Sequence, residues 1–174
     1  MRITDLLKAC SVELNGTPQT KEETIKQMVA LMEKGGNVTD VEKYKAGVFA
    51  REEEGTTGIG EGIAIPHAKT DAVNAPGLAA MVIPAGVDYD ALDGQPVDLV
   101  FLIAAPNTED NVHLEVLSRL SMLLMDESFK QNLLKAKTVE EFLAVVDRAE
   151  NARKIPALSN FIECAMIHDG LELP

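Results

Sequence analysis

The sequence has little of what membrane proteins and nucleic-acid-binding proteins need. No apolar run approaches the roughly 20 residues that a helix needs to cross a bilayer. The N-terminus MRITDLLKACSVELN lacks the long apolar stretch and small-residue cleavage site of a signal peptide. Basic residues are few, because 16 Lys and Arg stand against 28 Asp and Glu, giving a formal net charge of −12. Nucleic-acid affinity depends on clustered Lys and Arg, so we expect no nucleic acid, no direct membrane insertion and a cytoplasmic location.

Cysteine is also scarce. Cys10 and Cys164 lie near opposite ends of the 174-residue chain, without CxxC spacing. Such a pair indicates neither a disulfide framework nor a zinc site, so we assign these residues no chemistry. The remaining composition, 46% hydrophobic and 25% charged, is that of an ordinary globular chain. It predicts one domain with a short appendage.

Two amphipathic helices are expected first. Thr20 and Glu23 have the spacing of a capping box, and apolar residues with a helical period follow them. A second helix is expected to begin at Thr39, with Glu42 at the same spacing, and to run to Arg51 and an acidic stretch.

Strands and further helices follow in the order of a layered domain. The expected strands lie at 62–66, 78–84 and 97–105, and the expected helices at about 110–125, 126–136 and 138–150. The third strand is almost entirely apolar, which is typical of a central strand covered on both faces. The order predicts an α/β or α+β domain over residues 1–150. Residues 151–174 resemble a tail or linker, with a short helix at 157–167.

The segment GIGEGIAIPHAK concentrates glycine before a histidine. Gly58, Gly60 and Gly62 lack the Lys and Ser or Thr of a P-loop, and the expected order of helix then strand is the reverse of a dinucleotide site. Glycines allow positive φ, so backbone N–H groups can converge on an anion, with the hydroxyls of Thr56 and Thr57 beside them. A tight helix-to-strand connection explains the glycines equally well.

His67 follows this segment directly. Pro66 fixes its own φ and biases Ile65 toward an extended backbone, so the imidazole is expected to leave the end of the strand in a defined direction. A neutral imidazole is a competent nucleophile near neutral pH. A hydrogen-bonded structural histidine is the alternative at this position.

Two further residues suit an anion beside His67. His113 lies in the first turn of an otherwise apolar helical face, and a helix N-terminus favours negative charge. A core histidine bonded to a carbonyl is the alternative. Arg51 ends the second helix and has a planar fork that can clamp phosphate or carboxylate. An ion pair with Glu53 or Glu54 is its alternative.

Zinc hydrolysis is the competing chemistry. It would use His67 and His113 with Glu61 or Glu115 as ligand or base. The sequence has no HExxH pair and no second close histidine, so the metal signal is weak. The residues fit better an anionic group that is transferred onto and off an imidazole, although they do not specify it uniquely.

The segment RE…TGIGEGIAIPHA, residues 51–68, closely resembles the phosphorylation-site signature of the fructose/mannitol-type enzyme IIA domains of the bacterial phosphoenolpyruvate-dependent sugar phosphotransferase system. The likeness covers about residues 1–150, since the helices, PGLAAMVI, PVDLVFLIAAP, HLEVLSRLSMLLMD and TVEEFL fall in the family's order. It implies a three-layer sandwich in which a mixed sheet of about five strands has helices on both faces. It also implies no cofactor and no metal.

The resemblance implies a function and partners as well. His67 is expected to accept a phosphoryl group from phospho-HPr and to donate it to the EIIB domain of a sugar permease, with fructose as the favoured sugar. Arg51 and His113 match residues that stabilise the phosphoryl group. The phosphate-binding loop is expected at Thr56, Thr57, Gly58 and Gly60. A regulatory phosphorelay protein of the nitrogen-related EIIA type, which binds partners according to its phosphorylation state, is the alternative.

Overall fold

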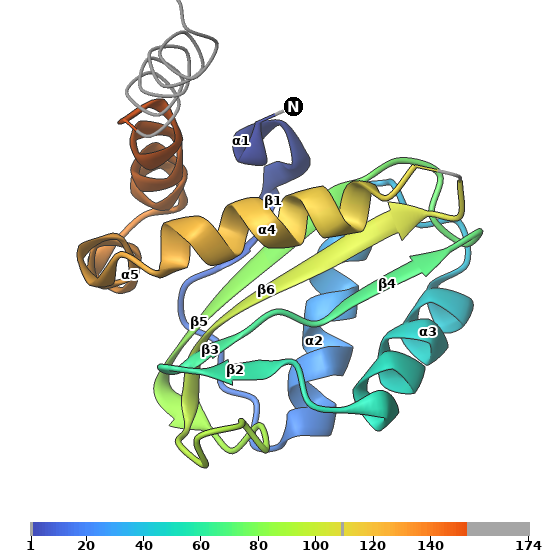
Figure 1. The fold of residues 1–174 in the computed structure, drawn as a ribbon, viewed down its shortest axis with the longest axis horizontal. Coiled ribbons are helices and arrows are strands. Elements are labelled where there is room, and N and C mark those ends of the chain that lie inside the picture. The colour runs from blue at the N-terminus through green and yellow to red at the C-terminus, as the bar shows by residue number, and fades with distance from the viewer. Residues whose placement is uncertain (1, 109, 153–174) are drawn as a thin grey trace, which may run out of the picture.

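A mixed sheet lies between two layers of helices (Figure 1). The computed structural model describes residues 2–108 and 110–152. In chain order the strands are β1 (Leu7–Glu13), β2 (Gly58–Gly60), β3 (Ile63–Ala64), β4 (His67–Thr70), β5 (Gly77–Val87) and β6 (Val97–Pro106). The helices are α1 (Ile3–Leu6), α2 (Lys21–Lys34), α3 (Val41–Glu54), α4 (Val112–Leu124), α5 (Glu127–Lys135) and a helix over 139–152. In these ranges no helix combines the length and apolar character needed to cross a membrane.

β6 is the central strand of the sheet. It pairs antiparallel with β5 on one side and parallel with β3 and then β4 on the other. β1 pairs parallel with β5, and β2 pairs antiparallel with β3. The predicted three-layer sandwich is confirmed, with six strands in the described ranges where about five were expected.

The two faces of β6 bury different helices. Successive side chains of a strand point to opposite faces, so an unbroken apolar run supplies two cores at once. One core, with α2 and α3, takes Val100, Leu102 and Ala104. The other, with α4, α5 and the helix over 139–152, takes Leu99, Phe101 and Ile103. The prediction of a central strand covered on both faces is therefore confirmed.

The starts of the first two long helices were predicted with unequal success. Thr20 caps α2 as expected, because its side chain accepts from a first-turn N–H. For α3 the predicted cap is wrong by one residue. The Thr39 hydroxyl donates to the Ala72 carbonyl (3.0 Å), and Asp40 accepts instead from the N–H of Lys43 (3.1 Å). Thr39, which local spacing favoured as the cap, is thus engaged in a tertiary hydrogen bond instead.

The C-terminal end of the domain is the helix over 139–152. Thr138 accepts from the N–H of Glu141 (3.1 Å), which confirms the expected N-cap, although the Glu141 carboxylate accepts from the N–H of Lys137 (2.9 Å), one residue before the cap. The helix continues two residues beyond 150, where the domain was predicted to end. The predicted short helix at 157–167 and most of the predicted tail lie outside the described residues.

The strand that was expected at 62–66 is shorter in the structure, and a second strand begins directly after Pro66. β3 is short, and the chain resumes as β4 at His67, so the prediction that His67 ends a strand is wrong. Proline has no N–H to donate to a ladder. Its carbonyl still accepts a bond from β6 (3.0 Å), but the N–H of Ile65 turns to the carbonyl of Thr57, just before β2 (3.0 Å). His67 therefore opens a new strand beside the central one.

The turn between β2 and β3 is held by a side chain of α5. Glu61 and Gly62 have φ of 58° and 75°, in the left-handed region. The buried Lys130 of α5 donates to the Glu61 carbonyl and lies 3.6 Å from the Asp98 carboxylate. A Cβ on Gly62 would lie 2.7 Å from that carboxylate and 2.8 Å from Lys130 Nζ. Backbone conformation and close contact therefore both favour glycine here.

Two alanine substitutions separate these causes. Gly94 has a similar φ of 72°, with nothing within 4 Å of an added Cβ. Gly94→Ala is expected to lower the free energy of unfolding by about 1–2 kcal/mol through backbone strain alone. Gly62→Ala should lose a further ~1–3 kcal/mol through overpacking. Urea unfolding measures both, and equal losses would show that Lys130 and Asp98 leave room at the turn.

Candidate functional site

His67 is tied to the backbone through its ring. Its Nδ1 lies 3.0 Å from the carbonyl oxygen of Ile65. A carbonyl only accepts hydrogen bonds, so Nδ1 carries the proton. In the neutral imidazole, Nε2 then has the free lone pair. The half-buried ring is thus held as the tautomer whose nucleophilic nitrogen points away from this backbone contact.

His113 lies across from His67, in the first turn of α4. The two ring centroids are 6.3 Å apart, with 29° between the ring planes. Ala68 packs into the core with α2 and α3, so the preceding side chain, His67, points to the α4 layer. The structure therefore brings the two predicted histidines together.

The protonation of His113 is restricted by burial. Its Nδ1 is buried and has no hydrogen-bond partner among the described residues. A proton on that nitrogen would be an unpaired buried donor, so the neutral ring carries its proton on Nε2. Burial lowers the pKa of His113, and His67 and the positive charge of Lys69 lower it further. His113 thus offers a neutral N–H donor near the His67 ring.

Lys69 is a charged residue of the site that sequence reasoning missed. It lies two residues after His67, on the same face of β4. Its Nζ is 3.5 Å from the side-chain oxygen of Asn111, the residue before α4. Strand alternation would have revealed Lys69 if residues 67–70 had been recognised as a strand.

Arg51 approaches the site from the other layer. α3 runs antiparallel to β4, because Lys43 pairs with Asp71 and a Cβ on Gly47 would lie 3.4 Å from the Cβ of Ala68. One helical turn further, Arg51 comes level with the residues just before β4. In the described ranges β4 pairs only with β6, so this is an edge of the sheet where side chains of both layers can meet.

The Arg51 guanidinium is used locally at the helix end. Its Nη1 donates to the carbonyl of Gly55 (2.9 Å). Within the ranges described, neither Glu53 nor Glu54 forms an ion pair with it, so the alternative expected from the sequence is wrong. The other guanidinium donors remain to contact an anion.

The predicted loop residues Thr56, Thr57, Gly58 and Gly60 lead into and build the β2–β3 hairpin. The N–H of Thr57 (3.2 Å) and its hydroxyl both donate to the Glu52 carboxylate. Thr56 Oγ1 accepts from the N–H of Gly58 (3.1 Å). A Cβ on Gly58 would lie 2.8 Å from the backbone of the loop between β5 and β6. These polar groups therefore hold the hairpin in place.

A buried carboxylate beneath the hairpin also escaped sequence reasoning. Glu52, 6% exposed, accepts from Thr57, from the Tyr89 hydroxyl (3.0 Å) and from Lys21 Nζ (2.8 Å). Burial and the charge of Glu52 raise the pKa of Tyr89, which stays a donor. In the sequence Glu52 is one of three consecutive glutamates, so no local signal distinguishes it.

The zinc alternative finds no ligand set. Over residues 2–108 and 110–152, no three His, Cys, Asp or Glu side chains are grouped to hold a metal ion. Of the expected additional ligands, Glu115 pairs with Arg119 (3.4 Å), and Glu61 forms the hairpin turn. His67 and His113 therefore face each other without a third ligand beside them.

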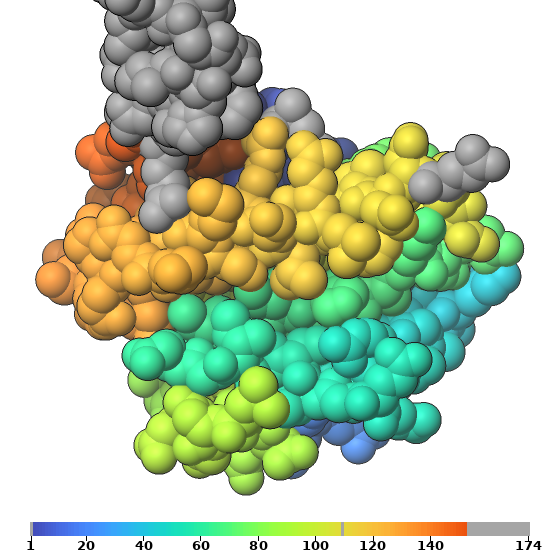
Figure 2. All heavy atoms as spheres, viewed as in Figure 1, coloured from blue at the N-terminus to red at the C-terminus, as the bar shows by residue number. Residues whose placement is uncertain are grey.

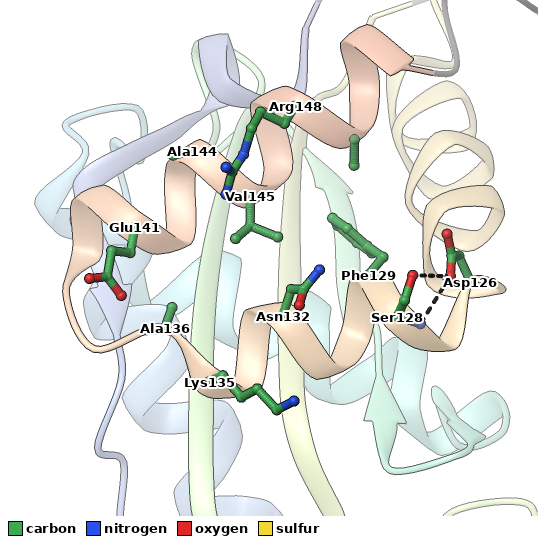
Figure 3. A pocket seen from close by; sticks show the side chains of 11 residues that line it. Asp126, Ser128, Phe129, Asn132, Lys135, Ala136, Glu141, Ala144, Val145 and Arg148 are labelled. Atoms are coloured by element: carbon green, nitrogen blue, oxygen red, sulfur yellow. Dashed lines mark hydrogen bonds between the residues drawn. The ribbon is translucent and has the colours of Figure 1, made fainter.

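A hollow of about 800 Å³ lies elsewhere, between α5 and the helix over 139–152 (Figure 3). Its lining mixes apolar and charged side chains, among them Phe129, Val145, Lys135 and Arg148. At one end Asp126 accepts from the N–H and hydroxyl of Ser128, as the dashed lines show. None of its lining residues belongs to the site around His67.

The site itself lies where α4 crosses the sheet edge. Figure 2 shows α4 (yellow to orange) lying directly on the green to teal segment that contains β2–β4. Ile59 of β2 and Leu114 of α4 are 47% and 52% exposed on these elements. The paired, half-buried histidines thus lie at the seam between α4 and the β2–β4 segment.

Comparison with known proteins gives a consistent result. The family model described as phosphoenolpyruvate-dependent sugar phosphotransferase system, EIIA 2, matches residues 5–149. The fructose-specific EIIABC component of Bacillus subtilis is 45% identical over 148 residues, which are 85% of this chain and 23% of that protein. The fructose-specific EIIA component of Haloferax volcanii is 40% identical over 152 residues, 84% of this chain and 99% of its own length.

Solved structures share the fold over most of the chain. The nitrogen regulatory protein IIA-Ntr of Neisseria meningitidis superposes with a TM-score of 0.76 at 30% identity, covering 82% of this chain and 97% of that one. The enzyme IIA for mannitol of Escherichia coli, in a complex with phosphorylated IIB, gives 0.71 at 31% identity, covering 82% and 99%.

The lowered pKa of His113 predicts a pH dependence of stability. At about pH 8, well above the ordinary histidine pKa of about 6.5, the residue is neutral in both states. As the pH falls below this pKa, the unfolded chain binds the proton first, so the free energy of unfolding decreases until folded His113 is protonated as well. Urea unfolding at about pH 8 and about pH 5.5 should show a smaller decrease for His113→Gln than for the wild type. Identical decreases would contradict the restricted protonation of this ring.

Proposed function

The chain belongs to the EIIA 2 family of the phosphoenolpyruvate-dependent sugar phosphotransferase system, and from this we propose that His67 is the residue that carries the phosphoryl group. The observation that supports this most is the bond from His67 Nδ1 to the Ile65 carbonyl. It leaves the Nε2 lone pair ready for attack beside a second histidine.

The transfer step needs no proton movement at the nucleophile. Nε2 of His67 attacks the phosphorus of the phosphohistidine of phospho-HPr, so an Nε2–P bond forms. The donor's N–P bond breaks, and its electron pair stays on the donor nitrogen. The proton stays on Nδ1 and keeps its hydrogen bond to the Ile65 carbonyl, and the imidazole becomes positively charged. That charge makes the ring a good leaving group for the next transfer.

The surrounding residues stabilise charge on the phosphoryl oxygens. A loose phosphoryl transition state requires positioning and electrostatic stabilisation above all. His113 donates its Nε2–H, Arg51 presents its planar fork, and Lys69 adds a positive charge. The N-terminus of α4 favours the anion further. Thr56, Thr57, Gly58 and Gly60 support this site by holding the hairpin that leads to His67.

Proteins are the proposed partners. Phospho-HPr is the donor, and the EIIB domain of a sugar permease is the acceptor, in the cytoplasm. The Escherichia coli relative was solved together with phosphorylated IIB, which supports an EIIB acceptor. The similarity to two fructose-specific components favours fructose. The half-exposed Ile59 and Leu114 beside the site suit an interface with another protein.

A regulatory phosphorelay is the second candidate function. The superposition on IIA-Ntr of Neisseria meningitidis favours it. In that role His67 is phosphorylated in the same way, but the phosphorylation state decides which proteins bind. The two functions therefore differ in where the phosphoryl group goes.

Labelling with radioactive phosphoenolpyruvate, enzyme I and HPr tests the site. His67→Ala should abolish acid-labile label, because the nucleophile is gone. His113→Ala should keep the label but slow its acceptance on the order of 10–100-fold, through loss of one donor. Arg51→Lys should also slow it, because a point charge does not replace the planar fork. His168, the third histidine of the sequence, lies outside the described residues, and His168→Ala serves as a control that should behave as the wild type.

Two results would overturn these assignments. Label that survives His67→Ala would place the carrier elsewhere. Complete loss in His113→Ala would make that residue more than a stabiliser.

Transfer onward separates transport from regulation. Labelled protein is mixed with purified EIIB domains for fructose and for mannitol. Transfer to the fructose EIIB at least about tenfold faster than to the mannitol EIIB is expected, since differences of about 1.4 kcal/mol in transition-state binding give that ratio. If no EIIB removes the label, the transport function fails and the regulatory one gains.

A further inference from the structure

We propose that Glu52 is the positioning residue for the His67 imidazole, acting through Thr57 and Ile65. The proposal rests on the proposed phosphorylation of His67 for its functional meaning. What Glu52 is proposed to fix is the orientation and the tautomer of the His67 ring. Three consecutive links carry it, and each is a hydrogen bond in the structure.

The first link joins the end of α3 to the start of the hairpin. The Glu52 carboxylate accepts both the N–H (3.2 Å) and the hydroxyl of Thr57. Both side chains are buried, at 6% and 5% exposure. A buried residue held through its backbone and its side chain by one carboxylate has little freedom to move.

The second and third links lead from Thr57 to the ring. The carbonyl of Thr57 accepts from the N–H of Ile65 (3.0 Å). The carbonyl of Ile65 then accepts from Nδ1 of His67 (3.0 Å). Ile65 lies between β3 and β4 and faces away from β6, which bonds in this segment to the carbonyls of Gly62 and Pro66. Its peptide groups instead connect Thr57 with His67.

The charge of Glu52 is balanced where it is buried. Lys21 Nζ lies 2.8 Å from one oxygen, and the Tyr89 hydroxyl donates to the other (3.0 Å). Together with Thr57, these groups give the two carboxylate oxygens four donors. A buried carboxylate whose two oxygens accept from all of these donors keeps a fixed orientation.

Glu52 also lies next to Arg51 in the last turn of α3. Because the carboxylate ties this turn to the hairpin, it relates the helix end that carries Arg51 to the strand that carries His67. Glu52 thereby fixes the position of Arg51, a proposed phosphoryl stabiliser, relative to His67, the proposed nucleophile. A role in stability alone would leave the His67 tautomer unchanged once the protein is folded.

Imidazole ¹⁵N chemical shifts report this tautomer directly. In the wild type at about pH 8, where a free imidazole is neutral, His67 should show a protonated Nδ1 and an unprotonated Nε2. Glu52→Gln keeps the size but replaces one acceptor oxygen with an NH₂ donor, so the four donors that the two carboxylate oxygens accept must compete for a single oxygen. The His67 shifts should move toward a mixture of tautomers, and phosphoryl acceptance should slow about tenfold, as fewer rings present a lone pair on Nε2.

Two matched variants complete the experiment. Asp71→Asn removes an exposed ion pair between α3 and the chain just after β4, and should change neither the shifts nor the rate. Thr57→Val removes the hydroxyl but keeps the N–H and carbonyl links, so its shift change should be smaller than that of Glu52→Gln. If Glu52→Gln does not fold, Tyr89→Phe, which removes one donor to the carboxylate, must still shift the His67 nitrogens.

The possible results separate this proposal from the proposed function. Wild-type ¹⁵N shifts of His67 in folded Glu52→Gln would overturn the positioning role, whether or not transfer slows. Unchanged shifts in Tyr89→Phe would overturn it if Glu52→Gln is unfolded. A wild-type protein that accepts no label refutes the carrier function, while moved shifts in Glu52→Gln would still support the link from Glu52 to the ring.

Discussion

The two backbone hydrogen bonds of Ile65 are the interactions on which the site depends. A proline cannot donate to a ladder, so the segment along β6 breaks between β3 and β4. Ile65 faces away from β6, because the N–H and C=O groups of successive residues point to opposite sides of a strand and the carbonyls of Gly62 and Pro66 accept from β6. Its N–H bonds to Thr57, and its carbonyl bonds to the His67 ring. The side of this segment that faces away from β6 thus orients the imidazole.

The break also places the site at an edge that both helical layers reach. β4 pairs with β6 on one side, with α4 crossing one face and α3 packing on the other. His113 comes from α4, and the turn with Arg51 comes from α3. A residue that exchanges a phosphoryl group with other proteins must be open to them, and a seam at a sheet edge gives that access where an enclosed pocket would not. The hollow beside α5 lies away from this seam.

Local sequence signals predicted the elements that local forces stabilise. The helical period of α2 and the apolar run of β6 were found, because the apolar residues that form each pattern are the ones that the element buries in the core. β1, β2 and β4 were missed, since short, glycine-rich or polar strands form only through their partners. Likewise the motif revealed His67, whereas Glu52 meets Tyr89 across 37 positions. No pattern within one segment reports such a contact.

The charges around the proposed carrier suit transfer better than tight binding. Lys21 is near the hairpin, but its charge is balanced by Glu52. His113 is restricted to a neutral donor by burial, so its N–H contributes less attraction than a cation would. That leaves the positive charges of Arg51 and Lys69 for the phosphoryl group in a chain whose net charge is −12. A carrier must release what it accepts, and a site that binds the phosphoryl group only moderately keeps both transfers close to balance.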